Sequence, residues 1–315
     1  MVAGCTGQAI PWTPNTGGTN IEPADVIVAS NEPVIPSEPS ADTIFTARFM
    51  VKNQHENNKA NNVGVWIYDT GKCTLNKVNS LTAEKVGGFW AGLMIETSAG
   101  TEHITDFAPG QQESVRMDLK SPSSSETVNL AYSCPIRYMI NYSFEAKSSV
   151  TTDVMALDRL KQIETQTGER PVYTRTLNVG AGPIRIMLEP ISSMPIEAGK
   201  TLRFEITLKN EGTGEYPSVM PDQLTLKVPK DFEPVLDDNN RACGGFFWGG
   251  TPDGETIIKY TNGRKIDLIE KQANPITCEF TTKTDVNIEK EYVITANLPY
   301  SYGYFGQEIT VPIKK

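Results

Sequence analysis

Four cysteines lie inside the chain where they could form disulfides, Cys73 and Cys134 in the first half and Cys243 and Cys278 in the second. Two cysteines per half are what intradomain disulfides in an oxidising compartment supply, although four cysteines allow three pairings. Each closed loop would stabilise the fold by about 4 kcal/mol in the chain-entropy model. No CxxC pair occurs, which disfavours a zinc site. We expect disulfides and no metal, with four buried thiols in a cytosolic protein as the alternative.

Residue types that serve catalysis are sparse. The two histidines, His55 and His103, each lie in a polar stretch, so we expect solvated loop side chains. No HExxH, GxSxG, P-loop or dinucleotide-binding motif occurs. Asp237-Asp238-Asn239-Asn240 crowds oxygen donors as calcium loops do, but it lacks their spacing and distal glutamate, which favours a solvated turn. We therefore expect no enzyme and no cofactor.

Two groups of aromatic residues could contact a ligand. Phe246, Phe247 and Trp248 lie between two glycine pairs and could form an exposed ledge for a glycan, while Tyr300, Tyr302 and Tyr304 recur with the period of one strand face. Aromatic rings also build sandwich cores and module interfaces, and this second interpretation is the stronger one.

A glycosylation sequon is present at Asn141-Tyr142-Ser143, which makes Asn141 a candidate modification site on a strand.

The composition is typical of all-β proteins. The chain has 315 residues and a formal net charge of −9, so phosphate repulsion opposes nucleic-acid binding, and no basic stripe offsets it. Gly and Pro interrupt short runs rich in Thr, Val, Ile and Tyr, as in sandwiches. No window reaches the 18 apolar residues of a membrane-spanning helix.

Three short motifs recur in the same order. Residues 48–53 resemble residues 205–210, residues 86–90 resemble residues 243–247, and Tyr142-Ser143-Phe144 resembles Tyr300-Ser301-Tyr302. The offsets are 157, 157 and 158 (209 − 52, 244 − 87 and 300 − 142). This spacing predicts two copies of one module, which would supply length, surface or valency. Coincidence among strands of similar composition is the alternative.

The prediction is two tandem immunoglobulin-like β-sandwich domains, residues 41–152 and 181–315. Residues 1–40 contain six prolines and predict an extended arm or tether. Within the arm, one segment of strand composition is a candidate donor to a neighbouring sheet: Asp25, Val26, Ile27, Val28 and Ala29.

Residues 153–180 are predicted to be a helical connector at the domain junction. Asp153 would cap a helix that ends at Gly168.

The segment Gly180 to Asn210 and the turn after it resemble the CARDB and related immunoglobulin-like cell-surface modules of archaea and bacteria. The resemblance rests on the strand at residues 184–190, the turn Ala198-Gly199-Lys200, and a second strand that ends in Lys209-Asn210-Glu211-Gly212-Thr213-Gly214. It implies an extracellular adhesive or structural sandwich and no catalytic residues.

Met1-Val2-Ala3-Gly4-Cys5 resembles the lipobox of secreted lipoproteins, which implies lipidation at Cys5 and membrane attachment only through that lipid.

These observations lead to two hypotheses. The first is a non-enzymatic extracellular or cell-surface protein with a structural or adhesive role. Its partners would be copies of itself or other surface proteins, with assembly into a filament or surface layer by strand addition through the arm. The second is a lipid-anchored module that binds a glycan or another ligand through Phe246, Phe247 and Trp248, which requires those rings to be solvent-exposed.

Overall fold

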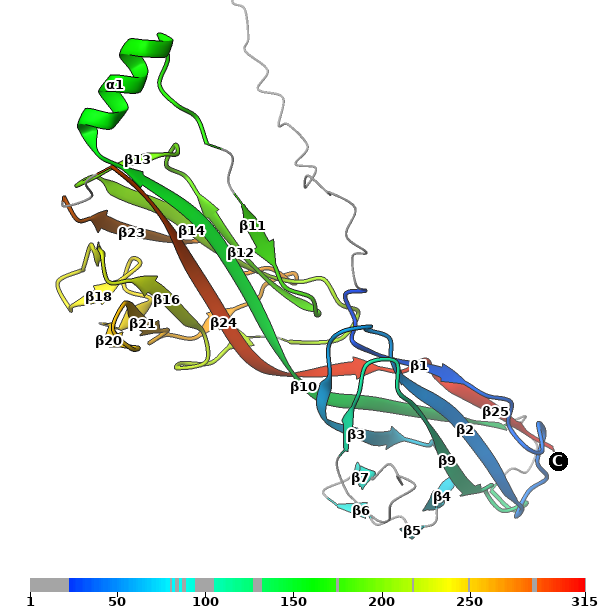
Figure 1. Cartoon of the computed structure of the whole chain (residues 1–315). Helices are drawn as coiled ribbons and strands as arrows, with labels where there is room; N and C mark the ends of the chain where they lie inside the picture. The colour runs from blue at the N-terminus through cyan, green and yellow to red at the C-terminus, as the bar shows by residue number, and fades with distance from the viewer. Residues whose placement is uncertain are drawn as a thin grey trace, which may run out of the picture.

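The computed structural model of the chain describes residues 23–79, 81–82, 85–86, 89–93, 105–126, 132–173, 176–216, 218–248, 250–284 and 288–314, without the side chains of 81–93 and 105. Within these ranges the regular structure consists of strands and one short helix (Figure 1). This confirms the all-β class.

A five-stranded sheet lies in the half of the molecule that contains the C-terminus, which we call the first half. Its strand order is β1-β2-β9-β4-β5. The strands are β1 (Ile27–Asn31), β2 (Ile44–Asn53), β9 (Gln112–Lys120), β4 (Thr74–Val78) and β5 (Leu81–Thr82).

A four-stranded sheet of order β12-β14-β23-β17 lies in the other half, the second half, together with two small two-stranded sheets, β15-β22 and β18-β19. The strands are β12 (Ile184–Pro190), β14 (Thr201–Asn210), β23 (Ile276–Thr282), β17 (Phe232–Pro234), β15 (Ser218–Val219), β22 (Ile266–Asp267), β18 (Arg241–Ala242) and β19 (Phe247–Trp248).

A twelve-stranded sheet runs through both halves. Its central path is β20-β21-β16-β24-β10-β3-β7-β6, with β11, β13 and β25 paired to β10 and β8 paired to β3. The strands are β20 (Thr251–Pro252), β21 (Ile257–Thr261), β16 (Thr225–Pro229), β24 (Glu289–Phe305), β10 (Tyr132–Met155), β3 (Ala60–Asp69), β7 (Phe89–Leu93), β6 (Lys85–Val86), β11 (Leu177–Val179), β13 (Ile196–Glu197), β25 (Ile309–Ile313) and β8 (Thr105–Phe107).

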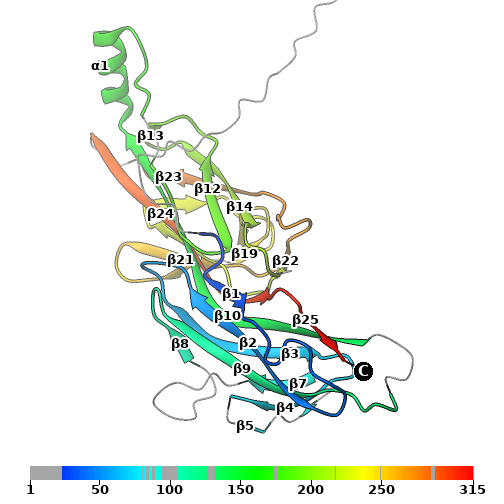
Figure 2. The same ribbon diagram turned by 90° about the vertical axis from the view of Figure 1, so that its right-hand side faces the viewer.

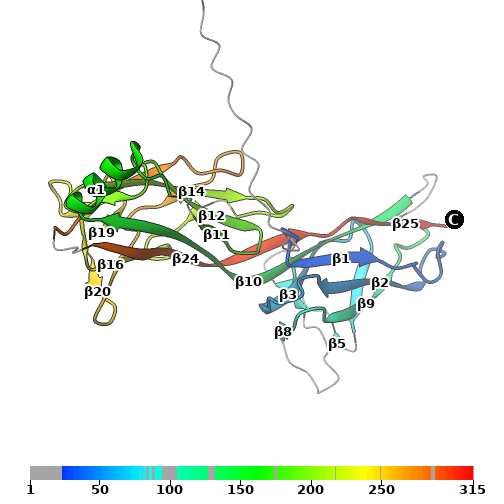
Figure 3. The same cartoon turned by 45° about the horizontal axis from the view of Figure 1, so that its top comes forward.

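We call the five-stranded sheet the first small sheet and the four-stranded sheet the second small sheet. Each of these two packs against its own section of the twelve-stranded sheet. In the first half, Phe49 of β2 stacks on Tyr138 of β10 with ring centroids 3.9 Å apart. In the second half, Phe280 of β23 meets Tyr260 of β21 edge to face at 5.6 Å. Alternate residues of β2 and β14 are buried, as a sheet with one face on a core requires. The molecule is therefore two-layered in both halves (Figure 3).

The strands β10 and β24 cross from one half to the other. They pair antiparallel without interruption from Met139↔Phe305 to Met155↔Glu289, and Figure 1 shows them side by side along the molecule. We call this pair the ribbon. The boundary predicted at residue 152 therefore falls inside β10, and the C-terminal part of β24 lies in the first half. The physical reason is that the alternation of buried side chains continues unbroken from residue 138 to residue 154, so nothing ends the strand.

The helix α1 (Leu157–Thr167) follows β10 at the end of the second half that is remote from the C-terminus (Figure 1). The predicted position at a domain junction is therefore wrong. Asp153 does not cap the helix, because β10 continues to Met155 and the N-cap is Ala156, with no side-chain cap. The helix does end at Gly168, which has a left-handed φ of 79°.

Candidate functional site

The candidate site is the middle of the ribbon, where the two halves meet. The 24 residues of β10 form a strand with a contour length of roughly 80 Å at about 3.3 Å per residue. At its middle, Tyr142 pairs with Tyr302, Ser143 with Ser301, and Phe144 with Tyr300. Of the three pairs of similar motifs that predicted a repeat, this one thus consists of partners across the ribbon. This feature could not be inferred from their similarity alone.

The inward face of this crossing is a cluster of buried aromatic rings. Tyr142 and Tyr302 lie with centroids 5.6 Å apart, Phe144 and Tyr300 lie 6.2 Å apart, and Tyr216 lies 5.3 Å from Tyr300. Burial raises the pKa of Tyr142, Tyr300 and Tyr302, and raises the pKa of Tyr216 to about 12. Aromatic pairs of this geometry add about 0.5–1.5 kcal/mol each beyond their buried area. The cluster therefore packs side chains of both halves into one core.

A buried asparagine fixes the polar side of this cluster. Asn210, the last residue of β14, accepts hydrogen bonds at Oδ1 from the Tyr302 hydroxyl (3.0 Å) and from Gly212 N (3.1 Å). Its amide Nδ2 donates to Gly214 O (3.0 Å). Because these groups are buried, each hydrogen bond avoids a desolvation cost of about 1–3 kcal/mol.

Asp25 joins the two halves directly. Its side-chain oxygens accept hydrogen bonds from Thr213 N (3.1 and 3.2 Å) and from Thr213 Oγ1 (2.9 Å), and the residue is only 9% exposed. Its backbone oxygen accepts from Gln54 Nε2 (2.6 Å). Asp25 precedes β1 of the first half, whereas Thr213 follows β14 of the second half. The contact therefore restrains the halves independently of the ribbon.

The expectation that His55 is solvated is wrong. The residue is fully buried, its Nε2 lies 2.7 Å from Pro23 O, and its ring meets Phe144 edge to face at 5.9 Å. Burial results because the turn after β2 folds against the ribbon. A polar neighbourhood in sequence therefore did not indicate exposure. His103 lies outside the described residues.

The predicted strand donor is already paired within its own chain. Asp25 and Val26 are buried, and β1 begins at Ile27 and pairs with β2 from Ile27↔Asn53 to Asn31↔Phe49. This segment, including Val28 and Ala29, is therefore part of its own sheet and not a free donor arm. The strand composition of the segment correctly indicated a strand, and β1 forms one edge of the five-stranded sheet (Figure 2).

The predicted aromatic ledge does not form as a unit. Phe247 is fully buried and Phe246 is half-buried against the core, while Trp248 is 47% exposed. Phe247 follows a turn that includes Cys243 and Gly244, both with positive φ, and this turn directs its ring inward. Trp248 is the one member of the three that a ligand could reach.

The second aromatic group belongs mainly to the core. Tyr300 and Tyr302 are buried in the cluster described above, and Tyr304 is half-buried against it. Asn141 lies on the opposite, outward face of the ribbon and is partly exposed.

The four cysteines form two disulfides, Cys73–Cys134 and Cys243–Cys278. The first joins the segment before β4 of the small sheet to β10 of the large sheet. The second joins the end of the β18 hairpin strand to β23. Each bridge lies within one half, as expected. Cys5 lies outside the described residues.

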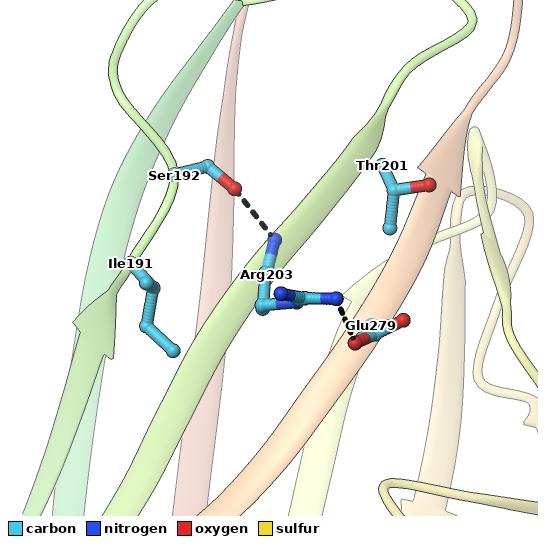
Figure 4. Close-up of a pocket in the computed structure, with 5 residues that line it drawn as sticks. All are labelled: Ile191, Ser192, Thr201, Arg203 and Glu279. Carbon is cyan, nitrogen blue, oxygen red and sulfur yellow. Dashed lines mark hydrogen bonds and ion pairs between the residues drawn. The ribbon is translucent and has the colours of Figure 1, made fainter.

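A shallow depression on the outer face of the second small sheet is lined by Ile191, Ser192, Thr201, Arg203 and Glu279 (Figure 4). There Arg203 pairs with Glu279 at 2.7 Å, and its backbone N donates to Ser192 Oγ at 2.9 Å. These contacts neutralise the depression and leave an ordinary open surface.

Asp237 completes a turn. Its Oδ1 accepts from Asn239 N and Arg241 N, both at 2.9 Å, and its Oδ2 pairs with Arg241 Nη2 at 3.1 Å. These hydrogen bonds lower the pKa of Asp237, against the opposing effect of desolvation. Among the described residues, no cluster of three potential ligands suited to a metal ion is found. In the part of the chain that the structure describes, no helix is long and apolar enough to cross a bilayer.

Comparison with known proteins gives little guidance. No family model matches the sequence, and no curated protein matches it. A search of solved structures finds the crystal structure of a collagen adhesin from S. aureus, with 12% identity over 94% of this chain and 95% of that chain, at a TM-score of 0.11. This score is too low to support an argument about fold or function. The resemblances to CARDB modules and to a lipobox remain predictions.

Proposed function

We propose that this protein is a non-enzymatic extracellular surface protein, in which two copies of one immunoglobulin-like sandwich form a stiff unit with a structural or adhesive role. The ribbon is the observation that carries the proposal. Separate domains joined by a flexible linker move relative to one another, whereas strands that run through both halves oppose such motion with a continuous hydrogen-bonded ladder. A stiff, elongated unit holds a binding or assembly surface at a set distance.

The strand registers support the proposal of two copies. Ile27 pairs with Asn53 in the first half, and Ile184 pairs with Asn210 in the second, so both partners are shifted by 157 positions. Gln54 N donates to Val26 O, and Glu211 N donates to Pro183 O at the same shift. Independent sandwiches have no reason to share both a register and a spacing.

The disulfides support an extracellular location, because such bridges persist in oxidising compartments and are rare in the cytosol. The test is to label intact cells that produce the protein with a membrane-impermeant biotin reagent. The thiols are then blocked and the intact mass is measured. We expect labelling before lysis and no free thiol among the four cysteines. Labelling only after lysis, with four free thiols, would contradict the proposal.

The lipid anchor at Cys5 belongs to the same proposal and is tested by the same mass, which would exceed the polypeptide mass by the acyl chains. Proposed partners remain copies of the protein or other surface proteins. Assembly is not proposed to occur by donation of residues 25–29, which are buried or paired within the chain. Sedimentation velocity over a concentration series tests self-association, and a purely monomeric protein would exclude it.

A further inference from the structure

A second surface, on the outward face of the ribbon in the first half, has the features of a ligand platform. Three neighbouring strands place Gly64 of β3, Asn141 of β10 and Gly303 of β24 in one row, because Asn141 pairs with Gly64 on one side and with Gly303 on the other. We call these three residues the glycine-flanked row. Asn141 thus lies in the middle of the sheet, and its neighbours on both adjacent strands are glycines, which have no side chains.

Local structure does not require Gly64. Its φ is not in the left-handed region, and a Cβ added there would meet only Trp66 Nε1, at an ordinary contact distance of 3.8 Å. Glycine inside a strand costs about 0.5–1 kcal/mol relative to alanine and often marks a close approach by a ligand. Gly303 likewise lacks a positive φ, although a Cβ there would lie 3.2 Å from Asn141 Oδ1. Because the two glycines have no side chains, the sheet surface on both sides of the Asn141 amide stays open. We call this open surface the floor.

An aromatic row borders this floor. Two residues further along each strand, the pairings place Met139 between Trp66 and Phe305. Trp66 is 37% exposed and Phe305 is 41% exposed, and the Phe305 ring meets Tyr68 edge to face at 6.3 Å. Trp66 and Phe305 lie on strands separated by two strand spacings, about 10 Å. Large rings that remain this exposed on a sheet face provide apolar contact area.

Hydroxyl groups lie on the other side of the floor, and most of the nearby charges are paired. Ser143 and Ser301 face each other across the ribbon, and Asn62 Nδ2 donates to Ser143 Oγ at 3.4 Å. Beyond the aromatic row, Arg137 pairs with Asp69 (3.2 Å) and Glu308 (2.7 Å). Beyond the serines, Lys147 pairs with Glu145 at 2.6 Å. Glu215 forms an antiparallel bridge with Gly303 and is exposed, so its carboxylate borders the platform without an ion pair among the described residues. The platform therefore offers rings, an amide and hydroxyls beside one negative charge.

We propose that the platform formed by Gly64, Trp66, Asn141, Gly303 and Phe305 binds a neutral oligosaccharide. A pyranose ring combines apolar C–H faces, which pack on aromatic rings, with hydroxyls that bond to an amide having both donors and an acceptor. The Glu215 carboxylate beside Gly303 disfavours an anionic occupant, and the other nearby charges are paired. The platform does not depend on the stiffness proposed for the ribbon, so failure of either proposal leaves the other standing.

The experiment is isothermal titration of the full chain with cellohexaose, maltohexaose and chitohexaose. We expect at least one to bind, and we expect Trp66→Ala to weaken its binding by at least about tenfold, or 1.4 kcal/mol. Trp248→Ala is the matched control, since it removes the exposed tryptophan of the other half, and it should leave the affinity unchanged.

A second variant separates binding from folding. Gly64→Thr adds a β-favouring side chain to the floor, so it should block binding without lowering the unfolding midpoint. The proposal is overturned if none of the three sugars binds at millimolar concentration. It is also overturned if both Trp66→Ala and Gly64→Thr bind as the unmodified protein does. A glycan covalently attached to Asn141, detected by intact mass, would occupy the floor and contradict it as well.

Discussion

The two halves of the molecule use the same hydrogen-bonding device at the end of corresponding strands, but they complete it differently. Asn53 and Asn210 end β2 and β14, and each Oδ1 accepts from the backbone N two residues later, in His55 and Gly212. In the second half, Asn210 Oδ1 also accepts a hydrogen bond from the Tyr302 hydroxyl. In the first half, Asn53 Nδ2 instead donates to three backbone oxygens. The backbone arrangement is therefore shared, while side chains adapt it to each half.

A second difference lies in what surrounds these asparagines. Gly212 leaves room for Asp25 of the first half, because a Cβ on Gly212 would lie 2.5 Å from Asp25 Oδ1. The corresponding His55 instead fills space beside Phe144. The second half is thus shaped to receive a segment of the first, which makes the contact between the halves asymmetric. The following variants test whether the halves nevertheless unfold as one unit.

Removal of the disulfides should have the largest effect. The variant Cys73→Ala/Cys134→Ala should lose about 4 kcal/mol of unfolding free energy in the chain-entropy model. Cys243→Ala/Cys278→Ala should lose slightly less, because the sequence separations are 61 and 35 residues. Urea unfolding under oxidising conditions measures both, with the reduced unmodified protein as control. Because the ribbon is shared, each variant should keep a single transition, and a split into two transitions would contradict cooperativity between the halves.

Removal of either of the two corresponding asparagines should have the next largest effect. Asn53→Ala and Asn210→Ala should each lower the unfolding free energy by about 3 kcal/mol, since both leave several buried groups without hydrogen bonds. Chemical denaturation measures the loss. Tyr302→Phe is the sharper comparison: it removes only the hydroxyl bonded to Asn210 and should cost about 1 kcal/mol. An unchanged stability in Asn210→Ala would show that the device is not needed in the second half.

The contact between the halves should have a smaller effect. Asp25→Asn weakens the acceptor of three hydrogen bonds from Thr213 and should cost about 1–2 kcal/mol. Thr213→Val removes only the hydroxyl donor and should cost less. A double-mutant cycle measures the coupling between the two positions. Additive effects would mean that the contact contributes nothing to holding the halves together.

The smallest effects concern two carboxylates with opposite pKa shifts. Hydrogen bonds from Lys290 (2.7 Å) and Tyr292 (2.9 Å) lower the pKa of Asp231. Its stabilising contribution is therefore present above the unfolded pKa and is lost as the pH falls through the folded value. Burial and the charges of Glu291 and Glu289 raise the pKa of Asp153, so its ionisation destabilises the fold at neutral pH.

At pH 7, Asp231→Asn should destabilise and Asp153→Asn should stabilise the protein, each by less than about 1 kcal/mol because both sites are near the surface. The Asp153→Asn difference should shrink as the pH falls toward 3.8, because the raised pKa lets this carboxylate become neutral above that value. The Asp231→Asn difference should persist at pH 4 and shrink only below 3.8, because the lowered pKa keeps the folded carboxylate ionised there. Thermal unfolding at about pH 7, 4 and 3 measures both. Shifts of the same sign for both variants would contradict the assigned causes.

Regular alternation made several strands predictable. Residues 184–190 form β12 with the predicted bounds, and the second predicted strand, which runs into Lys209-Asn210, is β14 (Thr201–Asn210). The ribbon is not evident from the sequence, because only the short segments 137–144 in β10 and 292–297 in β24 have a clear strand composition. Pro135 and Pro299 favour such short strands, yet both lie within paired strands.

The platform was beyond reach for a different reason. Gly64, Asn141 and Gly303 are far apart in sequence, and only the strand register brings them into one row. Asn141 is identified in the sequence only through its sequon, which does not indicate that it shares an exposed face with Trp66. The recurring motif at 86–90, which helped to predict the repeat, includes residues outside the described ranges.

Native-state amide hydrogen exchange across the ribbon tests the central claim most directly. If β10 and β24 unite the halves, the amides of residues 139–155 and 289–305 should open only with global unfolding, at one common free energy. Faster exchange at residues 142–144 and 300–302, with each half opening at its own free energy, would show that the ribbon bends at its middle and that the halves are independent.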